Sequence, residues 1–179
     1  ILNLDGSTLL QRAGLRNNGV DLLAGGPPCQ AFSVFGRRKG TEDPRGQLAY
    51  HYLRLVKELG PRAFIFENVY GLLTIEKGAV FRELLEQLAN PGNGLSYKIS
   101  YFRINASDYG VPQFRDRIFI IGSLEQKRVQ EILPVCSESN TLLSNLPAWR
   151  TVRDGLRGLP PRGSPDIANH VGRKHSQRI

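Results

Sequence analysis

The first half of the chain is divided into short apolar runs and longer stretches with helical spacing. Apolar runs at 20–24 and 63–66 end at glycine or at an acidic residue, and runs of this kind are typical of strands buried on both faces. Residues 47–59 and 79–88 instead carry apolar side chains every three or four positions, which predicts amphipathic helices. The resulting order of strand, helix, strand and helix predicts an α/β sheet with parallel crossovers.

Two further strands and two further helices are predicted around this unit. Residues 97–104 and 117–121 alternate like strands, and they are close enough in sequence to pair antiparallel at one edge of the sheet. Ser7 is expected to cap a first helix that ends at Leu15. Residues 124–134 are expected to form a last helix, and the proline-punctuated sequence beyond it is interpreted as a linker.

Composition narrows the class of protein further. The chain has 179 residues, enough for roughly one domain, and no apolar run approaches the ~20 residues of a membrane span. Cys29 and Cys136 are far apart and show no metal-ligand spacing, so we expect neither disulfides nor a metal site, and a reducing cytosol is the natural setting. The formal net charge of +8 favours a polyanionic partner such as nucleic acid.

Residues 20–33 hold the strongest candidate for chemistry. The apolar run ends at two glycines, where the backbone can turn, and Pro27 and Pro28 stiffen the exit. Cys29 then follows at the predicted carboxyl end of a strand, where ligands collect in open α/β sheets. A thiol placed there is a candidate nucleophile, and a buried, inert cysteine beside a turn is the alternative.

Charged side chains fall at matching places elsewhere in the predicted sheet. Glu67 directly follows the run at 63–66, and such an acid is costly to bury unless it pairs or takes up a proton. Arg115 and Arg117 alternate like strand residues, so they are expected to point the same way. Since the carboxyl ends of neighbouring parallel strands lie together, we expect a thiol, a carboxylate and two guanidinium groups around one pocket. Taken alone, Glu67 has the alternative of a carboxylate that caps the following turn or pairs with an arginine. For Arg115 and Arg117 the alternative is a solvated edge strand.

Four ordered stretches resemble signature motifs of the cytosine carbon-5 DNA methyltransferases. They are Gly26-Pro27-Pro28-Cys29-Gln30 with Phe32 and Ser33, the segment 43–48, Glu67-Asn68-Val69, and the segment 113–117 with Tyr109 just before it. The resemblance covers roughly residues 1–122 and implies part of a Rossmann-like S-adenosylmethionine-dependent methyltransferase fold, with a mainly parallel sheet and an antiparallel edge strand pair. Residues 1–123 would be the catalytic core, and residues 124–179 a helix and linker leading toward a target-recognition region.

The resemblance also implies roles for the candidate residues. Cys29 would add to carbon 6 of cytosine, which makes carbon 5 nucleophilic toward the methyl group of S-adenosylmethionine. Glu67 would hold and protonate ring nitrogen 3, a role that suits an acid kept protonated by an apolar pocket. Arg117 would hold the carbonyl oxygen of the base, and Arg115 would steady the cysteine loop and a nearby phosphate. The base must swing out of the duplex to reach this pocket.

Further contacts with DNA and cofactor follow from the same resemblance. Asn68 would orient the cysteine loop, and the basic segment 34–46 would close over the base and neutralise phosphates, with a plain solvated loop as the alternative. The expected substrate or DNA contacts are Gln30, Ser33, Arg45, Asn68 and Gln113. The expected cofactor contacts are Pro28, Leu48 and Ile1. The family's glycine-rich cofactor strand and its last motif do not occur in this sequence, so the chain alone is expected to bind S-adenosylmethionine poorly or not at all.

We therefore predict a DNA (cytosine-5-)-methyltransferase, of the kind found in bacterial restriction-modification systems. It is expected to act as a monomer on double-stranded DNA in the cytoplasm, at the nucleoid, without a membrane or a metal. A transfer-RNA cytosine-5 methyltransferase built on the same motifs is one alternative. A non-catalytic, methyltransferase-like DNA-binding fragment is the other.

Overall fold

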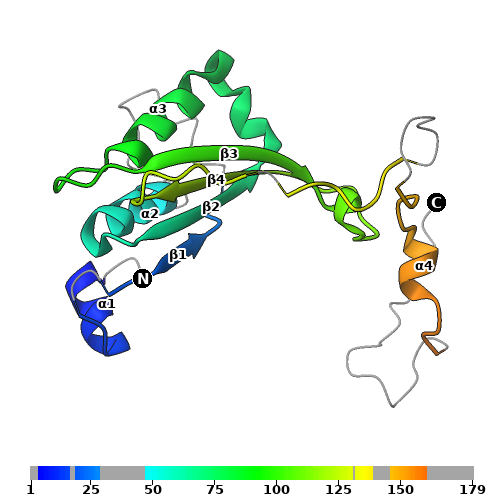
Figure 1. Cartoon of the computed structure of the whole chain (residues 1–179), viewed down its shortest axis with the longest axis horizontal. Coiled ribbons are helices and arrows are strands. Elements are labelled where there is room, and N and C mark those ends of the chain that lie inside the picture. Colours follow the sequence, from blue (N-terminus) through cyan, green and yellow to red (C-terminus); the bar gives the residue numbers. More distant parts are fainter. Residues whose placement is uncertain (1–3, 17–18, 29–46, 131, 139–145, 161–179) are drawn as a thin grey trace, which may run out of the picture.

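The computed structural model describes residues 4–16, 19–28, 47–130, 132–138 and 146–160, and Figure 1 shows how their helices and strands are arranged. In chain order these are α1 (Gly6–Ala13), β1 (Leu22–Gly25), α2 (Gln47–Leu59), β2 (Ala63–Val69), α3 (Ala79–Ala89), β3 (Lys98–Asn105), β4 (Asp116–Ser123) and α4 (Val152–Leu156). Three short 3-10 helices lie between them: η2 (Tyr70–Leu73), η3 (Ile75–Gly78) and η4 (Ala106–Tyr109). The predicted α/β class is confirmed.

The four strands form one sheet in the order β1-β2-β4-β3. β1 pairs parallel with β2, whereas β4 pairs antiparallel with both β2 and β3. The antiparallel pair at the edge is therefore present as predicted, but the described part of the sheet is mixed rather than mainly parallel. The physical reason is that the chain doubles back after η4, so that β4 enters between β2 and β3 instead of following a crossover helix (Figure 1).

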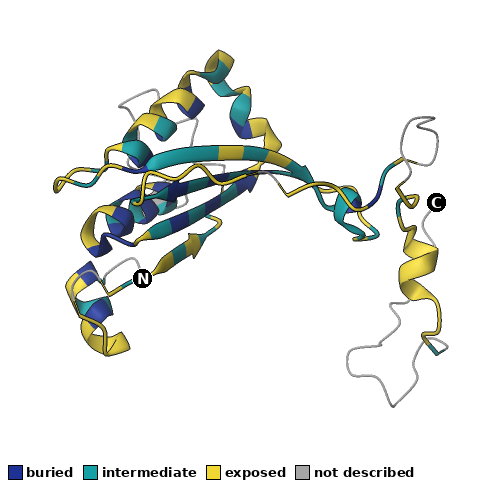
Figure 2. Ribbon diagram, in the orientation of Figure 1, coloured by how far each residue is buried: buried dark blue, intermediate teal, exposed yellow. Residues whose placement is uncertain are grey.

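The core lies between one face of the sheet and the helices α2 and α3. Buried side chains of β2 and β4 meet apolar side chains of both helices, among them Phe64, Phe66, Ile120, Val56 and Leu84. Figure 2 shows the buried positions gathered on these elements, whereas α4 is exposed along its length. The predicted helical spacing at 47–59 and 79–88 therefore marks the faces that pack against the sheet.

Two tyrosines tie the core to the backbone of the sheet. The Tyr52 hydroxyl on α2 donates to the carbonyls of Leu23 and Ile65, at 3.2 and 2.9 Å, and so bridges β1 and β2. The Tyr97 hydroxyl donates to the Pro61 carbonyl at 2.8 Å. Burial raises the pKa of both phenols, that of Tyr97 to about 12.

β1 differs from the prediction of a strand buried on both faces. It pairs only with β2 among the described strands, and its residues alternate between exposed and intermediate burial. Leu22 is 53% exposed for this reason. Asp21, just before the strand, accepts from Arg62 at 3.1 Å, an exposed pair that contributes little to stability.

The first predicted helix has a different cap. Asp5, and not Ser7, is the N-cap of α1, and its carboxylate accepts from the Thr8 amide at 2.7 Å and from the Ser7 hydroxyl at 2.8 Å. A carboxylate at this position also interacts favourably with the amino end of the helix dipole. The helix ends at Ala13, because Gly14 adopts φ +67° and turns the chain away.

The prediction of a helix at 124–134 is wrong for the described residues of that segment. The chain instead runs beside β3, where the Gln126 side chain donates to the Ser96 carbonyl at 2.7 Å and the Val129 amide donates to the Ser100 hydroxyl at 3.1 Å. The helix of this region is α4, which begins with a capping box between Thr151 and Asp154. No helix in the described part of the chain combines the length and apolar character needed to span a membrane.

Candidate active site

Glu67 and Arg117 form an ion pair where β2 and β4 lie side by side. Glu67 is directly opposite Phe119, and Arg117 is two positions before Phe119, so both side chains project from the same face of the sheet. Arg117 Nε lies 2.7 Å from Glu67 Oε1. Arg117 Nη1 also donates to the Asp116 carbonyl at 2.8 Å, which fixes the plane of the guanidinium group. The backbone ladder therefore brings together an acid and an arginine that lie 50 positions apart in the sequence.

The surroundings of Glu67 differ from the apolar pocket that would suit the role implied by the family resemblance. The side chains of Phe64 and Phe66 enter the core, whereas Ile65 and Glu67 project from the opposite face because side chains alternate along a strand. The Glu67 side chain is 31% exposed and lies against Arg117. It is thus a paired carboxylate that solvent and a ligand can reach.

Two glycines at the end of β1 make room for this arrangement, each in a different direction. A Cβ on Gly26 would lie 2.8 Å from Glu67 Oε2, too close for an unshifted carboxylate. A Cβ on Gly25 would lie 2.6 Å from the ring of Tyr52, on the core side. Gly25 therefore allows the helix α2 to pack, and Gly26 allows Glu67 to approach the turn that leads to Cys29.

Asn68 connects β2 to that same turn. Its amide nitrogen donates to the Pro27 carbonyl at 2.8 Å, and its side-chain oxygen accepts from the Val69 amide at 2.9 Å. Asn68 is only 3% exposed, so both hydrogen bonds are made away from solvent. A buried amide with both ends paired holds the Pro27 carbonyl in place.

The segment before β4 is held by Asn105, a residue that sequence reasoning missed. Its side-chain oxygen accepts from the Ser107 amide, the Ser107 hydroxyl and the Arg115 amide at 3.1, 2.8 and 3.2 Å. Asp116, which stands between the two predicted arginines, accepts from Arg103 Nε at 3.2 Å. The local signal for Asn105 was its place before a polar turn, where asparagine often pairs with the backbone.

The predicted site residues divide into three groups. Glu67, Arg117 and Asn68 gather around the turn after β1, as described above. Arg115 and Gln113 are exposed on the segment between η4 and β4, Pro28 is exposed at the end of the turn, and Leu48 is half-buried in the first turn of α2. Cys29, Gln30, Ser33, Arg45 and Ile1 lie outside the described residues.

Within the described ranges, no group of three or more histidine, cysteine or acidic side chains could hold a metal ion. Of the predicted cofactor contacts, Pro28 and Leu48 are described, and their side chains offer only apolar surface. Such surface fits a ring of S-adenosylmethionine, but the polar contacts of its ribose and amino-acid parts would have to come from other residues.

Comparison with known proteins identifies the family of this chain. A sequence model described as C-5 cytosine-specific DNA methylase matches residues 3–169. The chain belongs to this family. The resemblance inferred from the sequence motifs is thereby confirmed.

Two type II methyltransferases resemble the chain over different shares of their own length. The type II methyltransferase M.AquIA of Picosynechococcus sp. is 37% identical over 190 aligned residues, which cover 100% of this chain and 77% of the relative. The type II methyltransferase M.AgeI of Thalassovita gelatinovora is 34% identical, with 89% of this chain and 39% of the relative covered. The chain therefore spans most of one relative and less than half of the other.

Solved structures show the same fold. A prophage-encoded E. coli protein, assigned as a DNA modification methyltransferase, matches with a TM-score of 0.61 and 29% identity, over 88% of this chain and 40% of that chain. The Dnmt2 methyltransferase of S. pombe matches with a TM-score of 0.52 and 19% identity, over 73% of this chain and 36% of that chain. The second likeness concerns the fold alone.

Proposed function

We propose that this chain carries the catalytic residues of a DNA (cytosine-5-)-methyltransferase of a type II restriction-modification system. The observation that carries the proposal is the convergence of Glu67, Arg117 and Asn68 on the turn that leads to Cys29. Family membership and the type II names of the relatives support the same reaction. The net charge of +8 suits double-stranded DNA as the substrate.

The proposed reaction uses Cys29 as the nucleophile. Its thiolate forms a bond to carbon 6 of a cytosine that has swung out of the duplex, and the electron pair of the ring double bond moves toward carbon 5. S-adenosylmethionine, when bound, supplies the electrophilic methyl group that carbon 5 takes up. Loss of the carbon 5 proton to a base then restores the double bond and releases the Cys29 thiolate.

Glu67 and Arg117 hold the cytosine during this sequence. The Glu67 carboxyl group would face ring nitrogen 3 and share a proton with it, so that the ring develops no full negative charge when the thiolate adds. Arg117 uses Nε for Glu67 and Nη1 for the Asp116 carbonyl, which leaves Nη2 to donate to the carbonyl oxygen of the base. Asn68 positions the turn through the Pro27 carbonyl, and therefore orients the segment that leads to Cys29.

The decisive experiment is covalent trapping. The complete protein is incubated with S-adenosylmethionine and a pool of random-sequence duplexes that contain 5-fluorocytosine, which blocks release of the cysteine. We expect a covalent protein–DNA adduct that Cys29→Ala abolishes and that Cys136→Ala retains, because Cys136 is buried beside the segment after β3 and is 8% exposed. Absence of the adduct with wild-type protein would refute the proposal.

A comparison of DNA with transfer RNA as substrates distinguishes the proposed reaction from the related transfer-RNA methylation. Methyl transfer from labelled S-adenosylmethionine is measured on duplex DNA and on transfer RNA under the same conditions. We expect transfer to DNA, whereas transfer to transfer RNA alone would reassign the substrate and keep the chemistry. As part of the same proposal, the protein acts as a monomer in the bacterial cytoplasm.

A further inference from the structure

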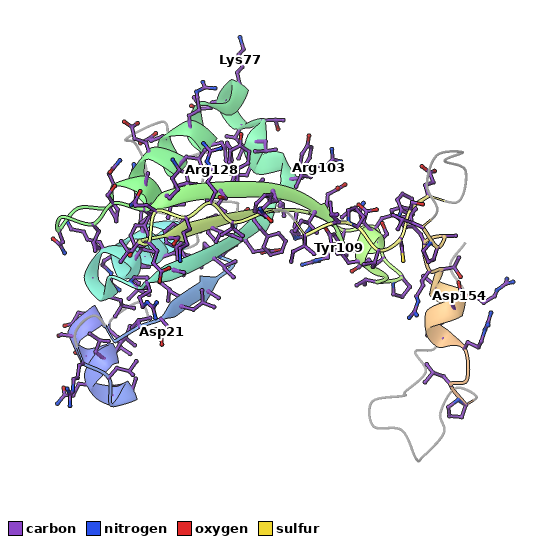
Figure 3. All side chains as sticks on the ribbon, in the orientation of Figure 1. Asp21, Lys77, Arg103, Tyr109, Arg128 and Asp154 are labelled. Carbon is purple, nitrogen blue, oxygen red and sulfur yellow. The ribbon has the colours of Figure 1, made fainter. Side chains whose placement is uncertain are left out.

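A concave surface lies at the tip of the β3–β4 hairpin, apart from the Glu67–Arg117 pair. It is a cleft of about 580 Å³ between the segment after η4 and the segment that leads into α4. Figure 3 labels Tyr109 on η4 and Asp154 on α4, the two elements on either side. The residues that matter for its chemistry are Pro112, Gln113 and Phe114 on one wall and Trp149, Arg150 and Val152 on the other.

The walls of this cleft are tied together by hydrogen bonds. Trp149 Nε1 donates to Asp108 Oδ1 at 2.8 Å. The Asp108 carbonyl accepts from the amides of Val135 and Cys136, both at 2.9 Å. The Tyr109 hydroxyl donates to the Ile132 carbonyl at 2.7 Å. The bond between Trp149 and Asp108 joins the two walls across 41 positions of sequence, and the other contacts hold η4 against residues 132–136.

The aromatic side chains in the cleft are arranged to receive a further ring. The rings of Phe114 and Trp149 meet edge to face, with centroids 5.0 Å apart and planes at 85°. Phe114 is 74% exposed, although its partner is anchored. The face of the exposed Phe114 ring that is turned away from Trp149 is therefore available to stack with a further ring.

Positive charge surrounds these rings. Arg150 lines the cleft, and Arg153 and Arg157 follow on or just after α4, so that residues 146–160 contain three arginines and one acidic residue, Asp154. Asp154 pairs with Arg157 at 3.2 Å. Arg115 adds a further exposed guanidinium group next to Phe114. The lining also includes the carboxylate Glu138, which follows Ser137, the residue bridged to Ala148 beside Trp149.

We propose that this cleft binds one unstacked nucleotide of the DNA, with its base against Phe114 and its phosphate near Arg150. This inference rests on the proposed function, because rotation of the target cytosine out of the duplex leaves neighbouring bases without a stacking partner. Aromatic rings next to arginines are the combination that binds such bases with little regard to sequence. Phe114 is three positions before Arg117, so the cleft and the residues proposed to hold the target base lie on neighbouring parts of the chain.

The test compares two oligonucleotides that differ only in their bases. The complete protein is titrated with a fluorescent thymidine 12-mer and with an abasic 12-mer of equal charge. Phe114→Ala is expected to weaken binding of the thymidine strand on the order of tenfold and to leave the abasic strand unchanged. Phe114→Tyr should keep wild-type binding. Tyr101→Ala, which removes another half-exposed ring far from the cleft, is the matched control.

Salt dependence tests the phosphate contact separately. Arg150→Gln is expected to weaken binding of both strands and to reduce the slope of log affinity against log salt by about 0.7, the value for one phosphate of a single strand. Arg12→Gln, an exposed arginine on α1, should leave the slope unchanged.

Two results would overturn the inference. One is a Phe114→Ala variant with an unchanged melting temperature that binds the thymidine strand as tightly as wild type. The cleft would then not bind a base, and a protein partner would be the remaining ligand to test. The other is a loss of binding that is equal for the thymidine and abasic strands. If wild-type protein traps 5-fluorocytosine and either result is obtained, the cleft inference fails alone. If Phe114 contributes to binding but no adduct forms, the proposed reaction fails instead.

Discussion

Gly25 and Gly26 are adjacent, but their replacement by alanine is expected to affect different properties: the stability of the fold for Gly25 and the rate of methyl transfer for Gly26. A methyl group on Gly26 would lie 2.8 Å from Glu67 Oε2, and ordinary contact begins at about 3.4 Å, so the carboxylate must retreat by about 0.6 Å. The carboxylate is the far end of a flexible, partly exposed side chain and can do so at little cost to the fold. The movement nevertheless changes its position relative to Arg117 and to the substrate.

The expected magnitudes follow from these geometries. A misplacement of about 1 Å at a reacting group can lower a rate by 10²-fold, so Gly26→Ala should reduce the rate of methyl transfer by about 10- to 100-fold. Its free energy of unfolding should change by less than about 1 kcal/mol. Gly25→Ala instead places a methyl group 2.6 Å from the ring of Tyr52, which is buried and bonded to two carbonyls. Overpacking of this kind costs about 1–3 kcal/mol.

The assay measures both properties on both variants. Thermal unfolding should show a melting temperature lowered by roughly 2–4 °C per kcal/mol for Gly25→Ala and nearly unchanged for Gly26→Ala. Single-turnover trapping on 5-fluorocytosine DNA, below the melting temperature, should show the larger defect for Gly26→Ala. Wild-type trapping by Gly26→Ala, or a greater loss of stability in that variant than in Gly25→Ala, would refute the assignment of the two glycines.

Three further outcomes are expected. Asn68→Leu should lower the free energy of unfolding by about 1–3 kcal/mol in a denaturant titration, because the Pro27 carbonyl and the Val69 amide lose the buried Asn68 side chain as their partner; an unchanged midpoint would contradict this. Burial raises the pKa of Tyr97 to about 12, so the stability that its neutral hydroxyl contributes is complete below pH ~10 and is lost as pH rises toward 12. Tyr97→Phe should therefore flatten the decline of the free energy of unfolding at alkaline pH. An identical decline in the variant would contradict this role of Tyr97. Trp149→Phe should lower stability by about 1 kcal/mol through the lost hydrogen bond to Asp108, measured by thermal unfolding, whereas full stability would show that this bond does not hold the cleft.

The sequence was informative wherever local pattern and motif agreed. The helical spacing at 47–59 and 79–88 and the alternation at 97–104 correspond to α2, α3 and β3. The motifs also identified Glu67 and Arg117 as partners of one site, and the structure brings these two side chains together. Local pattern suffices in these cases because periodicity reports which side of an element is buried.

Other features depend on contacts that no local pattern encodes. The run 63–66 predicted a strand buried on both faces, but only the face of β2 that carries Phe64 and Phe66 packs against the helices, and the face that carries Glu67 is partly exposed. Residues 124–134 were expected to form a helix, yet hydrogen bonds to Ser96 and Ser100 hold this segment in an extended path beside β3. The link between Asp108 and Trp149 likewise joins residues far apart in sequence.

The hydrogen-bond register between β2 and β4 constrains how this protein can vary. Glu67 is opposite Phe119 and Val69 is opposite Arg117, so insertion or deletion of a single residue within β4 would move the guanidinium group to the core face of the sheet. Length differences among functional homologues should therefore collect in the connections at the hairpin tip, around η4. There they can reshape the adjoining cleft while the acid and the guanidinium group keep their spacing.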